Sequence, residues 1–454
     1  MISLASLKHK IYYVVGLARS GEATVKALRK AGAKVFRFDD SIDPETGDYV
    51  VPEEIDWSVL DGLILSPGIP HTFPQPHKTA EMARAHNVPI LCDVDLLAQA
   101  CPKATFVAIT GTNGKSTTTA LLHHLLPDSH MGGNIGRPVL DLDADPAKQG
   151  DLYFLELSSY QLERVPHLKS SIAVWLNITP DHLDRHGDFQ GYVAAKKKIF
   201  TPFGDPQTII IGVDDDASFH VYEDLKRDAA KKIIPVSVCK ILPEGIAIVE
   251  TILYDQGQKV CSLKGLKNLV GSHNHQNIAA AYGVLKSLGH PFVLEDVISF
   301  KGLAHRQEYV ARQGNIIFIN DSKATNLTST LRALSCYENV HLLLGGIAKD
   351  SSLSALVPYK KSITHAYLFG KSAPQFSQEL TEKGIPHSCF ETLEEATRAA
   401  LQNAAQNNAK KAIILLSPAC ASFDQFKDFE QRGEAFKAVV HHLIKEQEES
   451  IAHG

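Results

Sequence analysis

The stretch from residue 105 to residue 126, TFVAITGTNGKSTTTALLHHLL, constrains the fold of this chain more than any other part of its sequence. Its apolar, β-branched start at Phe106–Ile109 predicts a short buried strand. A turn of small residues, Gly111-Thr112-Asn113-Gly114, follows, and a helix is predicted to begin at Lys115. A strand, a glycine turn and a helix N-terminus in this order direct backbone N–H groups toward an anion. The stretch therefore predicts a phosphate-binding loop.

Two kinds of side chain in this loop carry the expected chemistry. Lys115 would reach the outer phosphates of a nucleotide, and the hydroxyl of Ser116 or Thr117 would take a Mg²⁺ position. The usual pattern has glycine five residues before Gly114, where this chain has Ile109, so the loop is the shortened form G-T-N-G-K-S-T. An ordinary glycine-rich turn is the alternative, and it is less favoured because both flanking elements are in place.

Length and composition limit the class of protein. A chain of 454 residues is too long for one core, so two to four domains are expected. With 44% hydrophobic residues and a net charge of −5, the composition gives no electrostatic basis for binding nucleic acid or an anionic membrane. Seven scattered cysteines without a C-x-x-C pair indicate a reducing compartment. No apolar stretch has the length of a membrane span or of a signal peptide, so a cytoplasmic location is expected.

Strands and helices alternate through residues 11–94, which predicts a parallel sheet with its loops at the carboxyl ends of the strands. The glycine turn Gly16–Gly21 and the pair Asp39-Asp40 after the second strand suggest contacts with the phosphates and ribose of a nucleotide. The second glycine of G-x-G-x-x-G is absent, so an NAD site has weak support and a plain βα unit fits equally well. The strands are predicted at Tyr12–Val15, Lys34–Phe38, Val59–Leu65 and Pro89–Leu91, with a helix at 22–31.

Boundaries near residue 95 and near Lys301-Gly302 divide the chain into predicted domains 1–94, 95–302 and 303–454. Further strands of the middle domain are expected at Tyr153–Leu157, Ile172–Leu176, Thr208–Ile211 and Ile233–Val236, with a hairpin at Ile246–Cys261 and a helix at 274–288. The last domain is expected to contain strands at Ile316–Ile319, Leu342–Leu344, Ala366–Phe369 and Ala412–Leu416.

Two groups of the middle domain suit a metal ion and phosphates. Glu156 follows a buried strand, and a carboxylate at that position beside a phosphate loop suits Mg²⁺, which prefers oxygen ligands. His182 and His186 are spaced as in zinc proteases, but Leu183 replaces the glutamate that should follow the first histidine and Pro180 precedes the pair. A zinc peptidase is therefore disfavoured, and metal and phosphate contacts fit this polar cluster better.

Lys196 is the most informative single residue. At about 100° per residue it falls near the centre of an apolar helical face, and Lys198 falls on the opposite side. Burial there is expected to lower the pKa of the Lys196 amine and to make it nucleophilic. The alternative is a lysine whose stem lies under the surface while its ammonium group reaches solvent. The apolar face is formed by Phe189, Tyr192, Val193, Ile199 and Phe200.

Several loops add candidate ligand groups. The stretch 271–281 begins a helix with amides that would hold a purine or ribose, although by itself it is also a capped helix. In the last domain the loops 320–326, 345–349 and 417–424 place hydroxyls and lysines at the edge of a sheet, which suits a small dianion. His305-Arg306 adds a cation that would face ATP.

Together these motifs resemble the Mur ligase family, the ATP-dependent ligases that add amino acids to the cell-wall peptide precursor. The resemblance covers nearly the whole chain and includes residues 111–117, Glu156-Leu157-Ser158-Ser159, His182, Lys196, His273-Asn274-x-x-Asn277 and His305-Arg306. Residues 320–326 and 417–426 resemble the branch that adds D-glutamate to UDP-N-acetylmuramoyl-L-alanine.

The resemblance implies a three-domain α/β protein: a Rossmann-like N-terminal domain, a central P-loop ATPase domain with a parallel sheet, and a Rossmann-like C-terminal domain. These would bind the UDP-precursor, ATP and D-glutamate respectively, in a cytoplasmic monomer without nucleic-acid partners or membrane insertion. The implied reaction passes through an acyl phosphate in peptidoglycan precursor synthesis. ATP and Mg²⁺ at two sites are the implied cofactors, together with a carbamylated Lys196.

The resemblance also implies residue roles. The implied catalytic residues are Lys115, Glu156, His182 and Lys196, and the implied metal ligands are Ser116, Glu156, His182 and Lys196. ATP would meet Gly111, Thr112, Asn113, Gly114, Lys115, Ser116, Thr117, Asn274, Arg306 and Asp321. The UDP-precursor would meet Gly16, Leu17, Ala18, Asp39, Asn134, Ser158 and Gln161. D-Glutamate would meet Lys323, Thr325, Lys349, Ser422 and Phe429.

One departure and three alternatives bear on this interpretation. Ile347-Ala348 stands before Lys349, where the family usually has a polar or glycine pair. A sister ligase such as folylpolyglutamate synthetase should lack the 417–426 stretch, and a non-catalytic paralogue should have lost Glu156 or Lys115. An NAD oxidoreductase based on the first domain would leave the phosphate loop unexplained.

Overall fold

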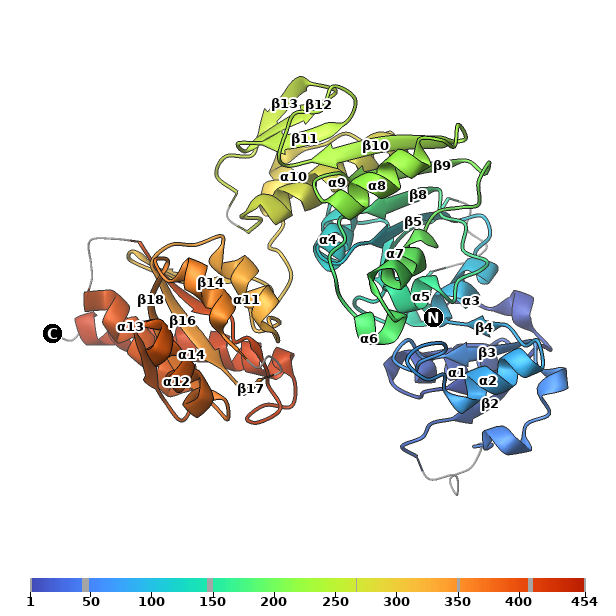
Figure 1. The fold of residues 1–454 in the computed structure, drawn as a ribbon, viewed down its shortest axis with the longest axis horizontal. Coiled ribbons are helices and arrows are strands. Elements are labelled where there is room, and N and C mark those ends of the chain that lie inside the picture. The colour runs from blue at the N-terminus through green and yellow to red at the C-terminus, as the bar shows by residue number, and fades with distance from the viewer. Residues whose placement is uncertain are drawn as a thin grey trace. The chain divides into compact units, whose positions relative to one another are not determined.

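A computed structural model describes residues 2–42, 49–144, 150–266, 268–348, 352–406 and 411–452 (Figure 1). The chain forms two compact units. The first unit comprises residues 1–264 and 272–297, and the second comprises residues 265–271 and 298–454. The predicted domain ranges 1–94, 95–302 and 303–454 each contain one of the three main sheets. The boundaries themselves stay a prediction.

The first unit begins with a four-stranded parallel sheet in the order β2-β1-β3-β4. Its strands are β1 (Ile11–Val15), β2 (Lys34–Phe38), β3 (Gly62–Leu65) and β4 (Ile90–Leu91), and its helices are α1 (Arg19–Lys30), α2 (Lys78–Ala85) and α3 (Asp93–Ala100). The predicted alternation is therefore confirmed. The expected strand at Val59–Leu65 starts three residues late, because Trp57–Val59 form a 3₁₀ turn in which Asp56 accepts a hydrogen bond from the Ser58 amide.

A nine-stranded sheet forms the larger part of the first unit, in the order β13-β12-β11-β10-β9-β8-β5-β7-β6. The strands from β5 to β11 pair in parallel, whereas β12 and β13 pair antiparallel, so the sheet is mixed. The strands are β5 (Thr105–Thr110), β6 (His130–Gly133), β7 (Leu152–Glu156), β8 (Ile172–Trp175), β9 (Gln207–Gly212), β10 (Lys231–Ser237), β11 (Ile246–Val249), β12 (Ile252–Asp255) and β13 (Gln258–Ser262).

The expected single hairpin at Ile246–Cys261 is wrong in one respect. The segment contains three strands and two turns, since the chain reverses at Glu250-Thr251 as well as at Gln256-Gly257. Glu250 and Thr251 take positive φ angles of 48° and 67°, a conformation that tight two-residue hairpin turns require. Neither residue type signals such a turn in the sequence, so only the structure reveals it.

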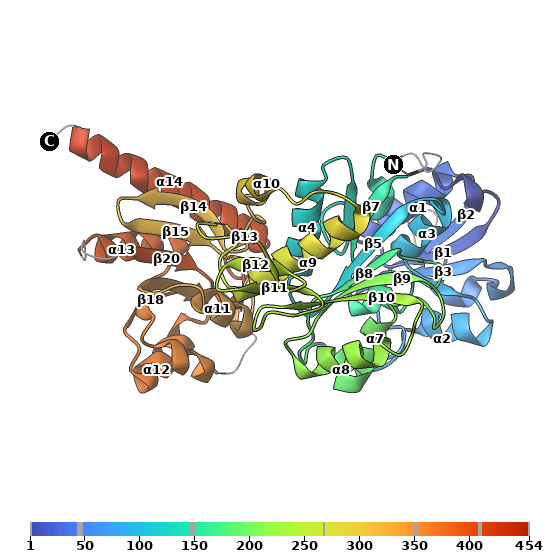
Figure 2. The same cartoon turned by 90° about the horizontal axis from the view of Figure 1, so that it is seen from above.

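Helices cover both faces of the nine-stranded sheet. Figure 2 shows α4 (Lys115–Leu125) and α9 (Ser272–Leu288) on one side of the strands, with α7 (Phe189–Lys197) and α8 (Asp216–Leu225) on the other. The helices α4 and α9 pack against each other, and α9 also packs on β9, β10 and β11. The remaining helices are α5 (Ser159–Leu162), α6 (Leu183–His186) and α10 (Leu294–Ser299).

The second unit is built on a six-stranded sheet in the order β14-β15-β20-β16-β18-β19, in which only the β14 edge pairs antiparallel. Helices α11 and α12 pack on one face and α13 and α14 on the other. The strands are β14 (Glu308–Gln313), β15 (Ile316–Asn320), β16 (Val340–Gly345), β18 (Ile363–Phe369), β19 (His387–Cys389) and β20 (Ala412–Leu416). The helices are α11 (Leu327–Leu334), α12 (Ala373–Lys383), α13 (Leu393–Gln406) and α14 (Phe429–Ala452).

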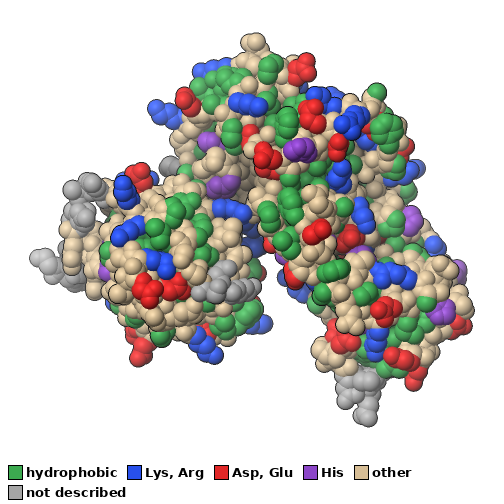
Figure 3. Space-filling view, in the orientation of Figure 1, with side chains coloured by type: hydrophobic (Ala, Val, Ile, Leu, Met, Phe, Trp, Pro, Cys, Tyr) green, Lys and Arg blue, Asp and Glu red, His purple; other side chains and the backbone are tan. Residues whose placement is uncertain are grey.

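The four strands predicted for the second unit are confirmed, but the polar edge strands β14 and β19 and the short pair β17 (Ile347–Ala348) and β21 (Cys420–Ala421) were not predicted. No helix in the described ranges combines the length and apolar character that a membrane crossing needs. Lysine, arginine and acidic side chains are interspersed over the face shown in Figure 3.

Candidate active site

The phosphate loop between β5 and α4 has the predicted geometry, and Gly114 is the position that glycine must occupy. Gly114 precedes α4 with a φ angle of 83°, and a Cβ atom there would lie 2.2 Å from Oδ1 of Asn277. Asn277 accepts a hydrogen bond from the Thr118 hydroxyl at 3.2 Å and donates one to Asn274 at 3.1 Å. The predicted ATP residue Asn274 is therefore buried in α9 beside α4, in the same unit as the loop.

The first part of the loop is held by the protein itself. Asn177 follows β8 and accepts two hydrogen bonds from this part of the loop. Its backbone carbonyl oxygen accepts one from the Thr112 amide at 2.9 Å, and its side-chain Oδ1 accepts one from the Asn113 amide at 3.0 Å. These two N–H groups are thus occupied. The first four N–H groups of a helix point along its axis away from the helix, so the start of α4 directs backbone amides toward an anion.

Two lysines meet at one backbone oxygen of the loop. Nζ of Lys115 donates to the carbonyl oxygens of Gly111 and Thr112 at 3.0 and 3.1 Å. Nζ of Lys196, in α7, donates to the same Gly111 oxygen at 3.0 Å and to the Thr110 hydroxyl at 3.3 Å. Lys196 is 1% exposed, which confirms the predicted burial. Burial and, after it, the charge of Lys115 hold the pKa of Lys196 well below its usual value.

Glu156 supplies a carboxylate at the same edge of the sheet, since it pairs with Ile109 at the end of β5. It is 2% exposed, and its Oε1 accepts a hydrogen bond from Asn134 at 3.3 Å. Its Oε2 is buried without a hydrogen-bond partner in the described residues. A buried carboxylate oxygen without a partner is costly, so this arrangement fits a cation.

The two histidines of the 177–186 cluster lie in different surroundings. His182 precedes α6 with a φ angle of 51°, and about half of its side chain is exposed. His186 is buried, and its ring bonds the Ser159 hydroxyl at 2.9 Å. Burial, with the nearby His182, lowers the pKa of His186 to about 4. The described residues contain no group of three or more His, Cys, Asp or Glu side chains placed to hold a metal ion, so bound Mg²⁺ would need other ligands as well.

The residues predicted to bind the UDP-precursor lie in the first unit, and several already have partners. Ser158 and Gln161 form a capping box at the start of α5, in which each side chain bonds the other residue's backbone N–H. Asp39 accepts the amide of Leu17 at 2.7 Å and so holds the glycine turn after β1. Gly16 in that turn has a φ angle of 88°, and Ala18 is exposed.

Arg306 and Asp321, both predicted to face the nucleotide, lie in the second unit. Asp321 is buried, where its carboxylate accepts hydrogen bonds from the Ser417 hydroxyl at 2.8 Å and the Gln307 amide at 3.1 Å. Burial raises the pKa of Asp321 to about 7. Nε of Arg306 is buried without a hydrogen-bond partner in the part of the chain that the structure describes.

The predicted D-glutamate residues lie on the loops of the second unit. Nζ of Lys323 lies 5.3 Å from the centre of the Phe429 ring, at the start of α14. Ser422 is buried at 3% exposure, and Thr325 is half-buried two residues after Lys323. Lys349 lies outside the described residues.

Sequence reasoning missed Arg432, which holds these loops together. Its fully buried guanidinium donates to Oγ and O of Ser322 at 2.9 and 2.8 Å, to Cys420 O at 3.0 Å and to Gly345 O at 3.3 Å. The signal was present, because Phe429, Arg432 and Phe436 have the spacing of one helical face and place a charge among apolar residues.

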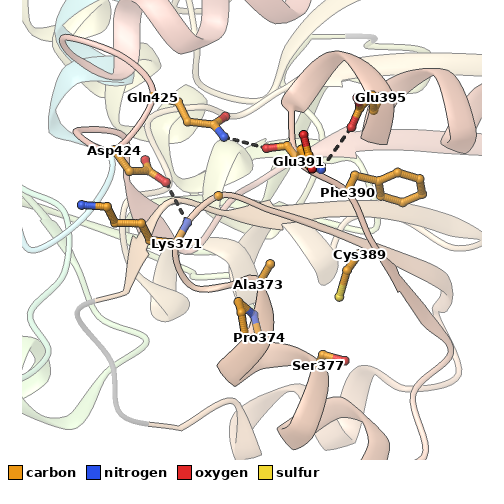
Figure 4. Close-up of a pocket in the computed structure, with 11 residues that line it drawn as sticks. Lys371, Ala373, Pro374, Ser377, Cys389, Phe390, Glu391, Glu395, Asp424 and Gln425 are labelled. Atoms are coloured by element: carbon orange, nitrogen blue, oxygen red, sulfur yellow. Dashed lines mark hydrogen bonds between the residues drawn. The ribbon is translucent and has the colours of Figure 1, made fainter.

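A cavity of about 1080 Å³ in the second unit does not contain the predicted D-glutamate residues. In Figure 4, Lys371, Asp424 and Gln425 lie at one end of this cavity and Ser377 at the other. The Lys371 amide donates to Asp424 at 3.0 Å, and Gln425 donates to the Glu391 carbonyl at 2.7 Å. The cavity therefore adjoins the 417–424 loop without including Ser422.

Comparison with known proteins gives consistent results. Residues 109–285 match the Mur ligase middle domain, and residues 305–420 match the Mur ligase glutamate ligase domain. The chain is 43% identical to the UDP-N-acetylmuramoylalanine--D-glutamate ligase of Paramagnetospirillum magneticum, over 97% of this chain and 98% of that protein. It is 39% identical to the enzyme of the same name from Rhizobium meliloti, over 96% and 97% of the two chains.

Solved structures agree in fold. The UDP-N-acetylmuramate-alanine ligase MurC of Thermotoga maritima superposes with a TM-score of 0.59 at 17% identity, over 95% of this chain and 99% of that one. The MurF ligase of Thermotoga maritima, solved with ADP, gives a TM-score of 0.59 at 14% identity, over 98% of both chains.

Proposed function

This chain belongs to the Mur ligase family, and from that membership we propose that it joins D-glutamate to UDP-N-acetylmuramoyl-L-alanine at the expense of ATP. The product is a precursor of peptidoglycan. The observation that carries the proposal is the 43% identity, over 97% of the chain, to an enzyme named for this reaction. The phosphate loop, the buried Glu156 and the buried Lys196 supply chemistry that the reaction needs.

The reaction proceeds in two steps. The carboxylate of the precursor attacks the γ-phosphorus of ATP, which gives an acyl phosphate and releases ADP. The neutral amine of D-glutamate then attacks the acyl carbon and forms an amide bond. Inorganic phosphate leaves with the electrons of the broken C–O bond, and the nitrogen releases one proton. Phosphoryl transfer of this kind depends mainly on positioning and on electrostatic stabilisation of the developing charge.

The loop residues bind the phosphates of ATP. The amides of residues 114–117 face the phosphates, and Lys115 leaves the Gly111 carbonyl to contact them when ATP is bound. Three further residues are proposed to contact the nucleotide. These are Asn274 in the first unit and Arg306 and Asp321 in the second.

The fit of Glu156 to a cation supports Mg²⁺ as the metal. Ser116, Glu156, His182 and Lys196 are the proposed ligands of two ions. Bound Mg²⁺ supplies a positive charge that neutralises the transferring phosphoryl group. A neutral Lys196 amine can add CO₂: an N–C bond forms, one proton is released, and the resulting carbamate presents two oxygens to a hard cation.

The substrate residues are divided between the units. The residues proposed to contact the UDP-precursor are Gly16, Leu17, Ala18, Asp39, Asn134, Ser158 and Gln161. The residues proposed to contact D-glutamate are Lys323, Thr325, Lys349, Ser422 and Phe429. Because Ser158 and Gln161 bond each other's backbone, they present the start of α5 as a fixed surface to the precursor. The proposed enzyme works as a cytoplasmic monomer, and neither nucleic acid nor membrane takes part.

A phosphate-release assay tests the proposal. The full-length protein is incubated with ATP, Mg²⁺, UDP-N-acetylmuramoyl-L-alanine and one amino acid from a panel of D- and L-forms. ADP and phosphate should form only when the precursor and D-glutamate are both present. Equal turnover with L-glutamate, L-lysine or meso-diaminopimelate would contradict the assignment.

A further inference from the structure

A second buried arginine, Arg164, joins the four-stranded sheet to the nine-stranded sheet of the first unit. It lies just after α5, and its side chain is fully buried. Its Nη1 donates to the carbonyl oxygens of Leu65 and Ser66, both at 2.9 Å. Its Nη2 donates to the carbonyl oxygen of Ile69 at 2.7 Å and to Nδ1 of His71 at 3.1 Å. All four bonds therefore reach one loop, residues 65–71, which follows β3.

The acceptors show that the arginine fixes a backbone conformation. A guanidinium has its donors in a rigid planar fork, so carbonyl oxygens that share it are held at fixed positions relative to one another. Burying a charge costs free energy. Here hydrogen bonds to main-chain carbonyl oxygens offset the burial of the Arg164 guanidinium, and no carboxylate bonds it in the described residues. Burial of Arg164 lowers its pKa only to about 10, so the side chain stays charged at neutral pH. The neighbouring His71 is neutral, since burial and the nearby Arg164 lower its pKa to about 3.

The loop held by Arg164 supports the glycine turn of the proposed precursor site. The Ser66 hydroxyl donates to the Gly16 carbonyl oxygen at 2.8 Å, and the Ser66 amide donates to Val15 at 3.0 Å. The approach is close, because a Cβ atom on Gly16 would lie 2.7 Å from Cβ of Ser66. A displaced Ser66 would therefore move the Gly16 turn.

The other end of Arg164 is fixed to α5. Its amide donates to the Gln161 carbonyl at 2.8 Å, and its carbonyl oxygen accepts the amide of Cys92 at 3.2 Å. Gln161 and Ser158, proposed precursor residues, form the capping box of that helix. A second cation reinforces the link, since Arg185 donates to Gly68 of the same loop at 2.9 Å and stacks 4.6 Å from the centre of the Tyr160 ring in α5.

We propose that Arg164 is a positioning residue for the UDP-precursor site. Arg164 sets the distance between the Gly16 turn, next to the four-stranded sheet, and the start of α5, where Ser158 and Gln161 form the capping box. The inference rests on the proposed function, because it takes the UDP-precursor as the ligand of these two elements. Arg164 does not contact the ligand. It acts through Ser66 on one side and through α5 on the other.

The test measures the dissociation constant of UDP-N-acetylmuramoyl-L-alanine on the full-length protein by calorimetry, and the KM of all three substrates. Arg164→Met keeps a long side chain but removes the donors, so precursor binding should weaken about tenfold or more. Arg164→Lys keeps the charge without the planar fork and should weaken binding by about threefold. The KM values for ATP and D-glutamate should stay within about twofold of the wild type.

Arg432→Met is the matched control, because Arg432 is an equally buried arginine that also bonds main-chain carbonyls, but in the second unit. It should leave the dissociation constant of the precursor within about twofold of the wild type. If Arg164→Met does not fold, Arg164→Lys and Ser66→Ala carry the test. Ser66→Ala removes the bond to Gly16 and should weaken precursor binding by about threefold to tenfold.

The outcomes separate this inference from the proposed function. Wild-type protein that neither binds the precursor nor releases phosphate with it would overturn both. In a second outcome, the wild type is active while the Arg164→Lys and Ser66→Ala variants melt at lower temperature yet bind the precursor normally. That result would overturn the positioning role alone. Equal weakening of precursor binding by Arg432→Met would also overturn it, because the effect would then reflect general loss of the fold.

Discussion

Lys115 and Lys196 donate to the same carbonyl oxygen, that of Gly111, and each Nζ lies 3.0 Å from it. Two ammonium groups this close repel each other, and the repulsion is strong where water is excluded. Burial of Lys196 and, after it, the charge of Lys115 lower the pKa of Lys196. Lys115 of the phosphate loop and Lys196 of α7 thus meet at one oxygen, and the lowered pKa makes the Lys196 amine readily neutral and nucleophilic.

Lys196→Ala should lose most of the ligase activity, on the order of 100-fold or more, while the protein remains folded. The physical reason is the loss of the carbamate that Lys196 is proposed to form. Acetate added to the assay should restore part of the activity by occupying the vacated space. Incorporation of ¹³C-bicarbonate, followed by NMR, checks for the carbamate directly.

Lys198→Ala is the control for that experiment. Lys198 is two residues further along, about half of its side chain is exposed, and it only pairs weakly with Glu163 at 3.8 Å. Its removal should be nearly silent. Full activity of Lys196→Ala, or an unmodified amine in a metal-bound crystal of the active enzyme, would refute the role of the carbamate.

Lys115→Ala should abolish measurable turnover, because it removes the cation that we propose contacts the transferring phosphoryl group. The loss of such a group is worth roughly 100-fold to 1,000-fold in rate. The substitution also removes a charge that lowers the pKa of Lys196, so that pKa should rise. Phosphate release measures the first effect, and the pH dependence of ¹³C-bicarbonate incorporation measures the second. Retained turnover would show that another group neutralises the phosphates.

Lys323→Ala and Ser422→Ala should raise the KM for D-glutamate while leaving that for ATP almost unchanged, because their proposed contacts are with the amino acid. Ser377→Ala is a matched control in the same unit, since Ser377 lines the 1080 Å³ cavity and is not among the proposed site residues. It should not change any KM. A raised D-glutamate KM in Ser377→Ala, with a normal one in Ser422→Ala, would place the amino acid in that cavity.

The raised pKa of Asp321 predicts a pH-dependent stability of the second unit. Its folded pKa of about 7 exceeds the value near 4 of an exposed aspartate, so the folded state binds the proton more tightly. The contribution to stability is full below about pH 4 and is lost as the pH rises through 7, by up to roughly 4 kcal/mol. Asp321→Asn cannot titrate and should lack this loss. Chemical unfolding from pH 4 to pH 8 measures the difference, and parallel profiles of the two proteins would contradict the prediction.

The local sequence pattern was sufficient to predict several elements of the structure. The phosphate loop, the burial of Lys196 and the strands β1, β2, β15, β16, β18 and β20 could all be predicted, because each depends on periodicity or turn chemistry within about ten residues. Edge strands such as β6 and β14 could not. They are polar or glycine-rich, and only pairing with a neighbouring strand makes them strands.

The sequence by itself determined the strand, turn and helix of the phosphate loop and the burial of Lys196, since a Gly-Lys-Ser turn and a lysine on an apolar helical face are local features. The tertiary structure decided how those residues are held. Three sets of hydrogen bonds join residues that are distant in the chain. Lys115 and Lys196 share the Gly111 carbonyl, Arg164 bonds residues 65–71, and Arg432 bonds the loops of the second unit. A guanidinium that bonds backbone oxygens has no preferred partner type, because every residue has a carbonyl. Spacing in the sequence can therefore indicate that an arginine is buried but not which carbonyls it bonds, and only folding brings these partners together.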